Sequence, residues 1–378
     1  LTRWFDYNDT FLAKEWAHPS DNFGSIYSYF CLNPNYKFID FTTALTKAYE
    51  IQGSLCLGTS LNQLGYDHVF YVKLASGAVF SSLLSKGNEK IVHRTINHIL
   101  LDGPSLRSYR HFPNVGKRKS WAAADASKRG IELAKISQLN DEVYSSIQDD
   151  KNWGFEKNYL NDSEIKFGKE LNDWVIQNVL FKVLFPAEFH GQSAVEGAIK
   201  LSKEFNQNID KVKKINIFTH EPAIRIIANK ENLSNASDRD HSLEYMVSAA
   251  LLFGELKYEM YGNDFSGLNK IESLRKKIVV SEDSNFTKNY YEFSKRHISN
   301  SIEIVYDDNS TSEKITIENP IGHPSRREEA IPLLKDKFIR NVQKVLSLEK
   351  SMSLWEQVIN LEKDDELTKF FNILQDDE

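Results

Sequence analysis

Cysteine is scarce in this sequence, because Cys31 and Cys56 are the only two among 378 residues. Two cysteines cannot form a disulfide framework, and these two lack the CxxC spacing of a redox pair or a zinc site. The composition therefore suits a reducing compartment and predicts two buried structural thiols. A single chain with two thiols also cannot supply the cysteine ligands of an iron–sulfur cluster, so a cluster-dependent enzyme is excluded.

Long apolar runs and an excess of positive charge are also missing. No uninterrupted apolar stretch approaches the roughly 20 residues of a membrane-spanning helix. The 47 Lys and Arg are outnumbered by 53 Asp and Glu, which gives a net charge of −6 and a pI near 6.0. We therefore expect a soluble protein with no nucleic-acid partner and no membrane partner. An anionic ligand has to be met by a local basic cluster.

The signatures of nucleotide and metal binding are absent as well. The sequence has no HExxH motif, no Walker-type phosphate loop and no well-placed GxGxxG. Its 10 histidines are dispersed, and none forms a close pair with zinc-ligand spacing. We expect no cofactor and no metal.

The apolar pattern predicts a helical first half and an α+β segment after it. Apolar residues recur at helical spacing through residues 38–133, with Gly53 as a local interruption, and residues 68–84 look interior because their small residues allow close helix approach. Residues 138–173 are polar and are typical of a surface excursion. A period-two pattern predicts a strand at residues 214–219 and a hairpin at 302–317.

Helical spacing returns after Pro324. Ile331, Leu334, Phe338 and Val342 form one apolar stripe, which predicts that the carboxy-terminal part rejoins the helical part.

Six stretches carry an unusual density of Trp, His, Arg and Lys. They are RWFDYNDTFLAKEWAHPSDN at residues 3–22, LNQLGYDHVFYVKLAS at 61–76, LDGPSLRSYRHFPNVGKRKSWAAADASKRG at 101–130, FKVLFPAEFHGQSAVEGA at 181–198, DRDHSLEYMV at 238–247 and NPIGHPSRREEAIPLLKDKF at 319–338. In this order they resemble the MmgE/PrpD family, which contains 2-methylcitrate dehydratase and cis-aconitate decarboxylase. The wording LRSYRHFPN, FPAEFHGQ and DRDH favours the dehydratase branch.

The resemblance implies a mainly α fold with an α+β second domain. It assigns residues 1–182 and 326–378 to an all-helical domain and residues 183–325 to an α+β lid. It also implies an active site between the two, a homodimer formed through the helical domain, and a tricarboxylate substrate dehydrated without metal. The compartment implied is the cytoplasm, or the mitochondrial matrix in a eukaryote.

The first stretch supplies the candidate acid–base pair. Asp6, Thr10 and His18 match active-site positions of the family, and an Asp near a His can fix the tautomer of the imidazole. Asp6 and His18 are therefore the predicted acid–base residues, with Thr10 binding substrate. On chemistry alone, Asp6 and Thr10 could equally well cap a helix, and the His-Pro-Ser segment could be a turn.

Basic residues are the candidates for holding carboxylates and developing negative charge. Lys119 matches a substrate-binding lysine of the family, and Arg110 lies in the same basic segment, which could otherwise be a solvated turn. Lys182 and His190 bracket the start of the lid and are predicted to act in catalysis when it closes. His68 matches a pocket histidine if one extra residue, Asp67, is allowed.

For two further candidate site residues, the sequence allows a structural role as readily as a functional one. Tyr245 matches a pocket hydroxyl of the family but has the helical spacing of a core tyrosine. Arg326 could reach the cleft or could belong to an exposed basic helix start.

Three functions remain open from the sequence. The first is dehydration of 2-methylcitrate, the second is decarboxylation of cis-aconitate, and the third is a non-catalytic relative that binds a tricarboxylate or a partner subunit. Family members carry roughly a hundred more residues of helix before the first motif. The absence of such residues from this sequence is the reason to keep the third possibility.

Overall fold

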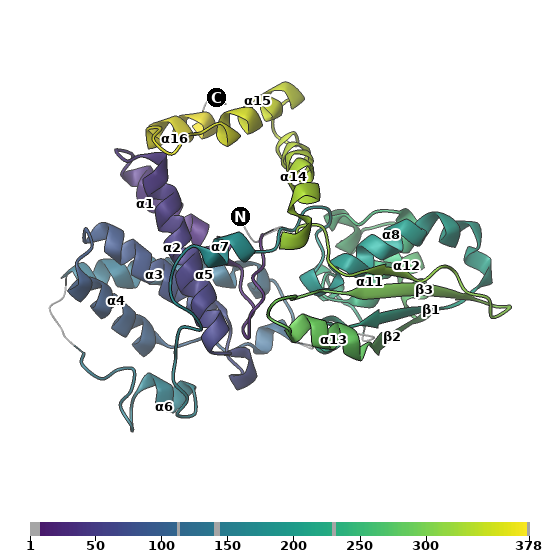
Figure 1. The fold of residues 1–378 in the computed structure, drawn as a ribbon, viewed down its shortest axis with the longest axis horizontal. Helices are drawn as coiled ribbons and strands as arrows, with labels where there is room; N and C mark the ends of the chain where they lie inside the picture. Colours follow the sequence, from purple (N-terminus) through teal and green to yellow (C-terminus); the bar gives the residue numbers. More distant parts are fainter. Residues whose placement is uncertain (1–7, 112–113, 140–143, 229–231, 376–378) are drawn as a thin grey trace.

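The computed structural model describes residues 8–111, 114–139, 144–228 and 232–375. Figure 1 shows a helical part beside an α+β part, with the last helices running from the second back to the first. The predicted mainly α fold with an α+β second part is confirmed. Asp6 lies outside the described residues.

The helical part surrounds one buried helix. Its elements are α1 (Phe23–Leu32), α2 (Phe38–Gly58), α3 (Val69–Leu84), α4 (Glu89–Asp102), α5 (Arg118–Leu139), α6 (Phe155–Tyr159) and α7 (Trp174–Asn178). All residues of α3 from Val69 to Ser81 are buried, which confirms the predicted interior position. The surface prediction for residues 138–173 holds for most of the described positions there.

Small residues let α3 and α5 approach closely. A Cβ atom added to Gly130 would lie 2.7 Å from the Lys73 carbonyl oxygen and 3.0 Å from the Gly77 nitrogen. The prediction that Gly53 interrupts the preceding helix is wrong, because α2 runs through it without a break. A Cβ there would lie 2.5 Å from Cγ1 of Val175, so Gly53 makes room for a neighbour.

The α+β part is built on a four-stranded sheet in the order β2-β1-β3-β4. Its strands are β1 (Val212–Thr219), β2 (Ile278–Glu282), β3 (Asn300–Tyr306) and β4 (Ile315–Ile317). β1 and β2 are parallel, and the other neighbours are antiparallel. The predicted first strand and the hairpin are both confirmed, with Ile302 opposite Ile315.

The α+β part also contains helices, of which the first two make the main helix contacts with the sheet. They are α8 (Gln192–Gln207), α9 (Glu221–Ile227), α10 (Ala236–Arg239), α11 (Leu243–Phe253), α12 (Leu268–Arg275) and α13 (Ser284–Tyr291). Ile215, Ile217, Ile302 and Ile304 are fully buried in one cluster with side chains of α8 and α11. A strand with period two has to bury one face in this way.

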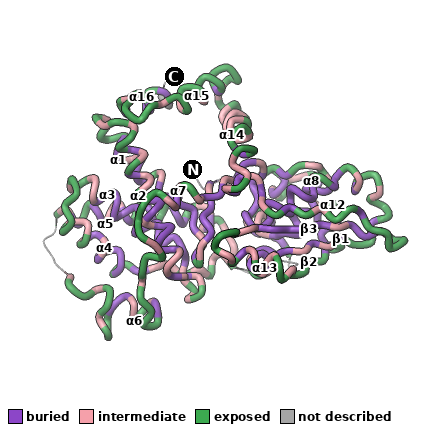
Figure 2. Tube along the Cα trace, in the orientation of Figure 1, coloured by how far each residue is buried: buried purple, intermediate pink, exposed green. Residues whose placement is uncertain are grey.

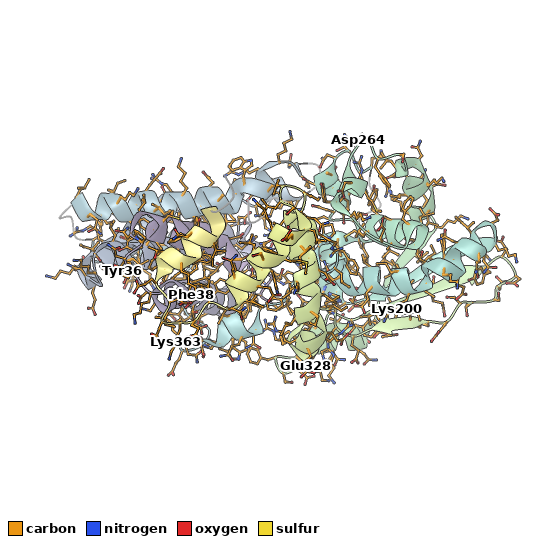
Figure 3. All side chains as sticks on the ribbon, turned by 90° about the horizontal axis from the view of Figure 1, so that it is seen from above. Tyr36, Phe38, Lys200, Asp264, Glu328 and Lys363 are labelled. Atoms are coloured by element: carbon orange, nitrogen blue, oxygen red, sulfur yellow. The ribbon has the colours of Figure 1, made fainter. Side chains whose placement is uncertain are left out.

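Three helices follow the sheet: α14 (Arg327–Val342), α15 (Leu348–Ile359) and α16 (Leu367–Gln375). The last one returns to the helical part, where Leu367, Phe370 and Phe371 join the cluster formed by α1 and α2. Backbone bonds secure the return, since Phe38 donates to Asp365 and Leu367 donates to Tyr36. Figure 3 shows Lys363 beside Tyr36 and Phe38.

The connecting helices are much less buried than the rest. Figure 2 shows α14 and α15 largely exposed or intermediate, whereas α3 and β3 are largely buried. Ile331, the first residue of the predicted apolar stripe, is 56% exposed. The two thiols also differ, because Cys56 is buried as predicted but Cys31 is exposed, so the prediction is wrong for Cys31.

Candidate active site

A cleft lies where the helical part meets the α+β part. It has a volume of about 230 Å³ and takes side chains from both, among them His18, His68 and Lys119 on one side and Glu188, Arg225 and His241 on the other. Three chain segments meet nearby, because Thr10 and Leu180 exchange backbone hydrogen bonds and Phe181 donates to Gly322. The cleft therefore depends on the contact between segments that are distant in sequence.

His18 enters the cleft from the loop before α1. Its Nδ1 lies 2.7 Å from the carbonyl oxygen of Asp9 and 3.3 Å from Oγ1 of Thr10. Since a carbonyl can only accept, Nδ1 carries a proton, and in the neutral imidazole the lone pair is therefore on Nε2. The Asp9 carboxylate is used elsewhere and accepts from the Ser20 backbone and hydroxyl. The loop thus presents His18 in the tautomer that a base requires.

His68 faces His18, with ring centroids 5.7 Å apart. Nδ1 of His68 lies 3.1 Å from Oδ1 of Asp67, and Arg110 donates to the other oxygen of Asp67 at 2.6 Å. Burial alone would raise the pKa of Asp67, but Arg110 and His68 outweigh it and hold this pKa well below its usual range. Asp67 is therefore a buried carboxylate that holds a histidine and an arginine at the cleft.

Arg107 and Arg110 each have a buried N–H group that makes no hydrogen bond to the described residues. Nε of Arg107 and Nη2 of Arg110 are buried, and neither has a hydrogen-bond partner among the described residues. Burial lowers the pKa of Arg107 because the charged guanidinium loses hydration, and repulsion from Arg110 lowers this pKa further. Buried donors without acceptors are costly, and an anion in the cleft would satisfy them.

Lys119 crosses the cleft. It stands near the start of α5, and its Nζ lies 2.7 Å from Oδ1 of Asp240 and 2.6 Å from Nδ1 of His241, just after α10. Asp240 and His241 also contact each other at 2.7 Å. This three-residue clasp joins the helical part to the α+β part at the cleft, which Lys119 and His241 line.

Glu188 lines the cleft, whereas His190 stands behind it. Nδ1 of His190 lies 2.9 Å from Oε2 of Glu188, and its Nε2 lies 3.3 Å from the Tyr290 hydroxyl. The imidazole also stacks on Trp16 at 3.6 Å between centroids. Burial would raise the pKa of Glu188, but His190, His241 and Lys182 lower it to about 2. Glu188 is therefore held as a carboxylate.

The structure separates the remaining candidates. Lys182 is 2% exposed and acts electrostatically on Glu188 without lining the cleft, and Thr10 contacts His18 from behind. Tyr245 is in the hydrophobic core of the α+β part and donates to the Met260 carbonyl at 2.5 Å. Arg326 pairs with Glu196 at 2.9 Å. Neither Tyr245 nor Arg326 reaches the cleft.

Several cleft residues were missed by the sequence interpretation. Glu188, Asp240 and His241 all lie within the quoted motifs, but Glu188 was passed over for His190, and Asp240 and His241 for Tyr245. Asp67 was treated only as an extra residue in its motif. Adjacent acidic and basic residues in DRDH and in FPAEFHGQ were the available signal, because paired charges of this kind have to find partners.

The arrangement suits a polyanion. Basic and imidazole side chains outnumber the acidic ones around the cleft, where they are His18, His68, Arg107, Arg110, His111, Lys119, Arg225 and His241, against Glu188 and Asp238. Opposite charge is needed to bring a multiply charged acid out of water. Within the described ranges, no group of three or more His, Cys, Asp or Glu side chains could hold a metal ion.

No helix in the part of the chain that the structure describes is long and apolar enough to cross a membrane.

Comparison with known proteins places the chain in a family. The MmgE/PrpD N-terminal domain profile matches residues 1–168, and the C-terminal domain profile matches residues 185–363. The chain is 41% identical to the 2-methylcitrate dehydratase of Escherichia coli K12 over 354 residues, which are 90% of this chain and 73% of that protein.

Similar relatives occur in fungi. The mitochondrial 2-methylcitrate dehydratase of Yarrowia lipolytica is 40% identical over 91% of this chain and 68% of its own length. A probable 2-methylcitrate dehydratase of Saccharomyces cerevisiae is 39% identical over 91% of this chain and 70% of its own. The chain belongs to the MmgE/PrpD family.

Proposed function

We propose that this chain is a 2-methylcitrate dehydratase, a hydro-lyase that removes water from 2-methylcitrate to give 2-methyl-cis-aconitate in propionate breakdown. The observation that carries the proposal is the similarity, along 90% of the chain, to a bacterial protein of that name. The basic cleft supports it, because the substrate has three carboxylates that need cationic partners. Citrate and cis-aconitate are further possible substrates of the same cleft.

In this proposal the basic residues bind and the two histidines transfer protons. Arg107, Arg110 and Lys119 hold the carboxylates, using donors that Arg107 and Arg110 keep buried without partners. Nε2 of His18 takes the proton from the substrate C–H bond. The electrons of that bond form the new double bond, the C–O bond breaks, and the hydroxyl leaves as water with a proton from His68.

The neighbouring groups set up these roles. Asp67, at 3.1 Å from Nδ1 of His68, pairs with the protonated imidazole that can act as an acid. Lys182 and His190 act through Glu188, whose carboxylate they stabilise on the far wall of the cleft. Asp6 completes the acid–base set that we propose on the family resemblance.

In this proposal the substrate lies between two domains of the chain. Residues 1–182 and 326–378 form the helical domain, and residues 183–325 form the lid, with the Lys119 clasp closing the space between them. We place the enzyme in the cytoplasm of a bacterium or in the mitochondrial matrix of a eukaryote, as one fungal relative is named mitochondrial. The reaction as proposed uses no metal or cofactor.

The direct test is turnover. Purified full chain incubated with 2-methylcitrate should show growing ultraviolet absorbance from the conjugated alkene, with the same rate after treatment with a chelator. His18→Ala should lower kcat by about 10² to 10⁴ because it removes the proposed base. His93→Asn is the matched control, since His93 is an exposed histidine on α4.

Other outcomes would replace the proposal. Release of carbon dioxide from cis-aconitate, with no alkene from 2-methylcitrate, would establish a decarboxylase. Calorimetric binding of citrate without any turnover at high protein concentration would establish a non-catalytic relative.

We also propose that the protein is a homodimer, as the family resemblance implies. Large apolar side chains stay exposed on the connecting helices and in the turn between them, including Leu348 at 55% on α15 and Val345 at 84% in the turn. Exposed apolar side chains that lie together on one surface mark an interaction site.

A further inference from the structure

A second cavity borders the cleft. It has a volume of about 810 Å³ and shares Trp16, Asn62, Arg225 and Ile226 with the cleft as a common wall. Trp16 is held in that wall by its stacking on His190 at 3.6 Å. The cavity is therefore a neighbouring compartment, and its size falls within the range of small-molecule sites, roughly 300–1,000 Å³.

Arg296 contributes a positive charge to the lining of this second cavity. It follows α13, and its backbone is left-handed with a φ of 51°, which is unusual for a residue with a side chain. Its guanidinium lies 5.0 Å from the ring centroid of Phe11, 5.6 Å from that of Trp174 and 5.8 Å from that of Phe293. Aromatic faces thus fix the position of the charge.

Arg296 forms no ion pair with an acidic side chain in the part of the chain that the structure describes. Within the described residues no carboxylate lies at ion-pair distance from it, and its Nη2 is buried without a hydrogen-bond partner. Among the other cations of the cavity, Arg225 bonds to Glu221 and Lys169 to Glu50, whereas the Lys14 side chain is exposed to solvent. Burial lowers the pKa of Arg296 to about 10, so the group remains charged at neutral pH.

A buried cationic donor without an acceptor is costly, by about 1–3 kcal/mol or more for a charged group. Cation–π contacts return part of this cost but leave the planar donor edge of a guanidinium unused. That edge fits the two oxygens of a carboxylate. The remaining wall near it, with Tyr291 and Phe293, is aromatic.

We propose that this second cavity is a binding site for a small organic monocarboxylate with an apolar body, distinct from the tricarboxylate cleft. The carboxylate bonds to the Arg296 guanidinium, and the apolar body lies against Tyr291 and Phe293. One unpaired arginine suits one carboxylate, whereas the cleft gathers several cations. The site does not depend on the reaction proposed for the cleft.

Cyclohexanecarboxylate is a suitable probe, because it is apolar, carries one carboxylate and leaves the tryptophan signal unobscured. It is titrated into the full chain while tryptophan fluorescence and heat are recorded, since Trp16 lines the cavity and Trp174 neighbours Arg296. We expect saturable binding and at least about tenfold weaker binding of the neutral analogue cyclohexylmethanol.

Variants separate this site from the cleft. Arg296→Met should raise the Kd of the probe at least about tenfold, and Arg296→Lys less, because lysine keeps the charge but loses the bidentate geometry. Phe293→Ala should raise it about threefold through lost apolar contact. Phe293 is 63% exposed, so this variant should fold even if a change at Arg296 does not. Lys119→Met should leave the Kd within about twofold.

The proposal is overturned if the probe does not saturate, or if its Kd is unchanged in both Arg296→Lys and Phe293→Ala. It is also overturned if Lys119→Met or added citrate abolishes binding of the probe, because the probe would then occupy the cleft.

Discussion

Glu15 is a buried carboxyl group that holds the turn beside the cleft. Its Oε2 accepts from the Asn62 backbone at 2.6 Å and from the Ser60 hydroxyl at 3.0 Å, while Oε1 is buried without a partner. Burial raises the pKa of Glu15 from 4.5 to about 7, against the opposing effects of these hydrogen bonds and of Arg107. The native protein therefore keeps a proton on Glu15 that the unfolded chain loses at lower pH.

This difference predicts the pH dependence of stability. A raised native pKa stabilises the fold below about pH 4.5, and the contribution is lost as pH rises to about 7, by about 3 kcal/mol in total. In Glu15→Gln this loss should vanish, because an amide does not ionise. The free energy of unfolding in urea is measured at pH 5 and pH 8 for both proteins.

We expect the difference between the two pH values to be smaller in Glu15→Gln than in the wild type by roughly 2–3 kcal/mol. Glu328→Gln, at an exposed position on α14, is the control and should behave as the wild type does. An equal difference in Glu15→Gln and wild type would show that Glu15 is ionised throughout.

At the residue scale, the sequence could indicate which side chains carry chemistry better than which ones meet. His18, His68, Arg110 and Lys119 were named from motifs, and all four line one cleft. Glu188 was overlooked in favour of His190 because neither hydrophobic periodicity nor residue type reveals which of these two residues faces the cleft. Residues two apart in a short turn can face opposite sides, and only the fold decides.

At the element scale, Gly130 lets the backbones of α3 and α5 approach each other closely. A Cβ there would meet backbone atoms, namely the Lys73 oxygen at 2.7 Å and the Gly77 nitrogen at 3.0 Å. Backbone cannot rotate away as the end of a side chain can, so the helices would have to separate.

Gly130→Ala should therefore destabilise the protein by roughly 1–3 kcal/mol, even though alanine is the better helix former by about 0.5–1 kcal/mol. Gly24→Ala is the matched control in α1, because a Cβ at Gly24 has no atom within 4 Å. That control should be neutral or slightly stabilising. The free energy of unfolding of each variant is measured by chemical denaturation. Equal changes in Gly130→Ala and Gly24→Ala would refute the close-packing argument.

Elements with strong periodicity were predictable, and elements that depend on a neighbour were not. The hairpin of β3 and β4 was visible from alternating isoleucines and a turn-forming loop. Gly53 was misjudged because propensity alone marks glycine as a helix interruption, while here Val175 occupies the space that a side chain would need. Tertiary contact thus reversed the local preference.

At the scale of the whole molecule, the return of the chain was predictable but the route was not. The apolar stripe after Pro324 predicted that the carboxy-terminal part packs on the helical part, and α16 does so through Leu367, Phe370 and Phe371. α14 and α15, however, run between the two bodies with much of their surface exposed (Figures 1 and 2). An apolar stripe in the sequence indicates that one face of a helix packs against something, but it does not indicate which element packs there.

The exposed face of α15 leads to the prediction of a dimer. Leu348, Met352 and Ile359 are 55%, 44% and 52% exposed, and their spacing places them on one side of the helix. Wild-type protein should scatter light as a particle of about twice 43.6 kDa. Leu348→Glu combined with Met352→Glu should give the monomer mass, because charge at an apolar contact opposes association.

The control for this pair is Ser353→Glu combined with Gln357→Glu, which adds the same charge on the opposite side of α15. It should remain dimeric, since net charge alone does not disrupt a contact that it does not touch. A monomeric wild type would refute the dimer, and a dimer that persists in the Leu348 and Met352 variant would move the interface to another face of the helical part. Because α14 and α15 together connect the sheet to α16, a dimer formed through α15 would also restrain the two bodies on either side of the cleft.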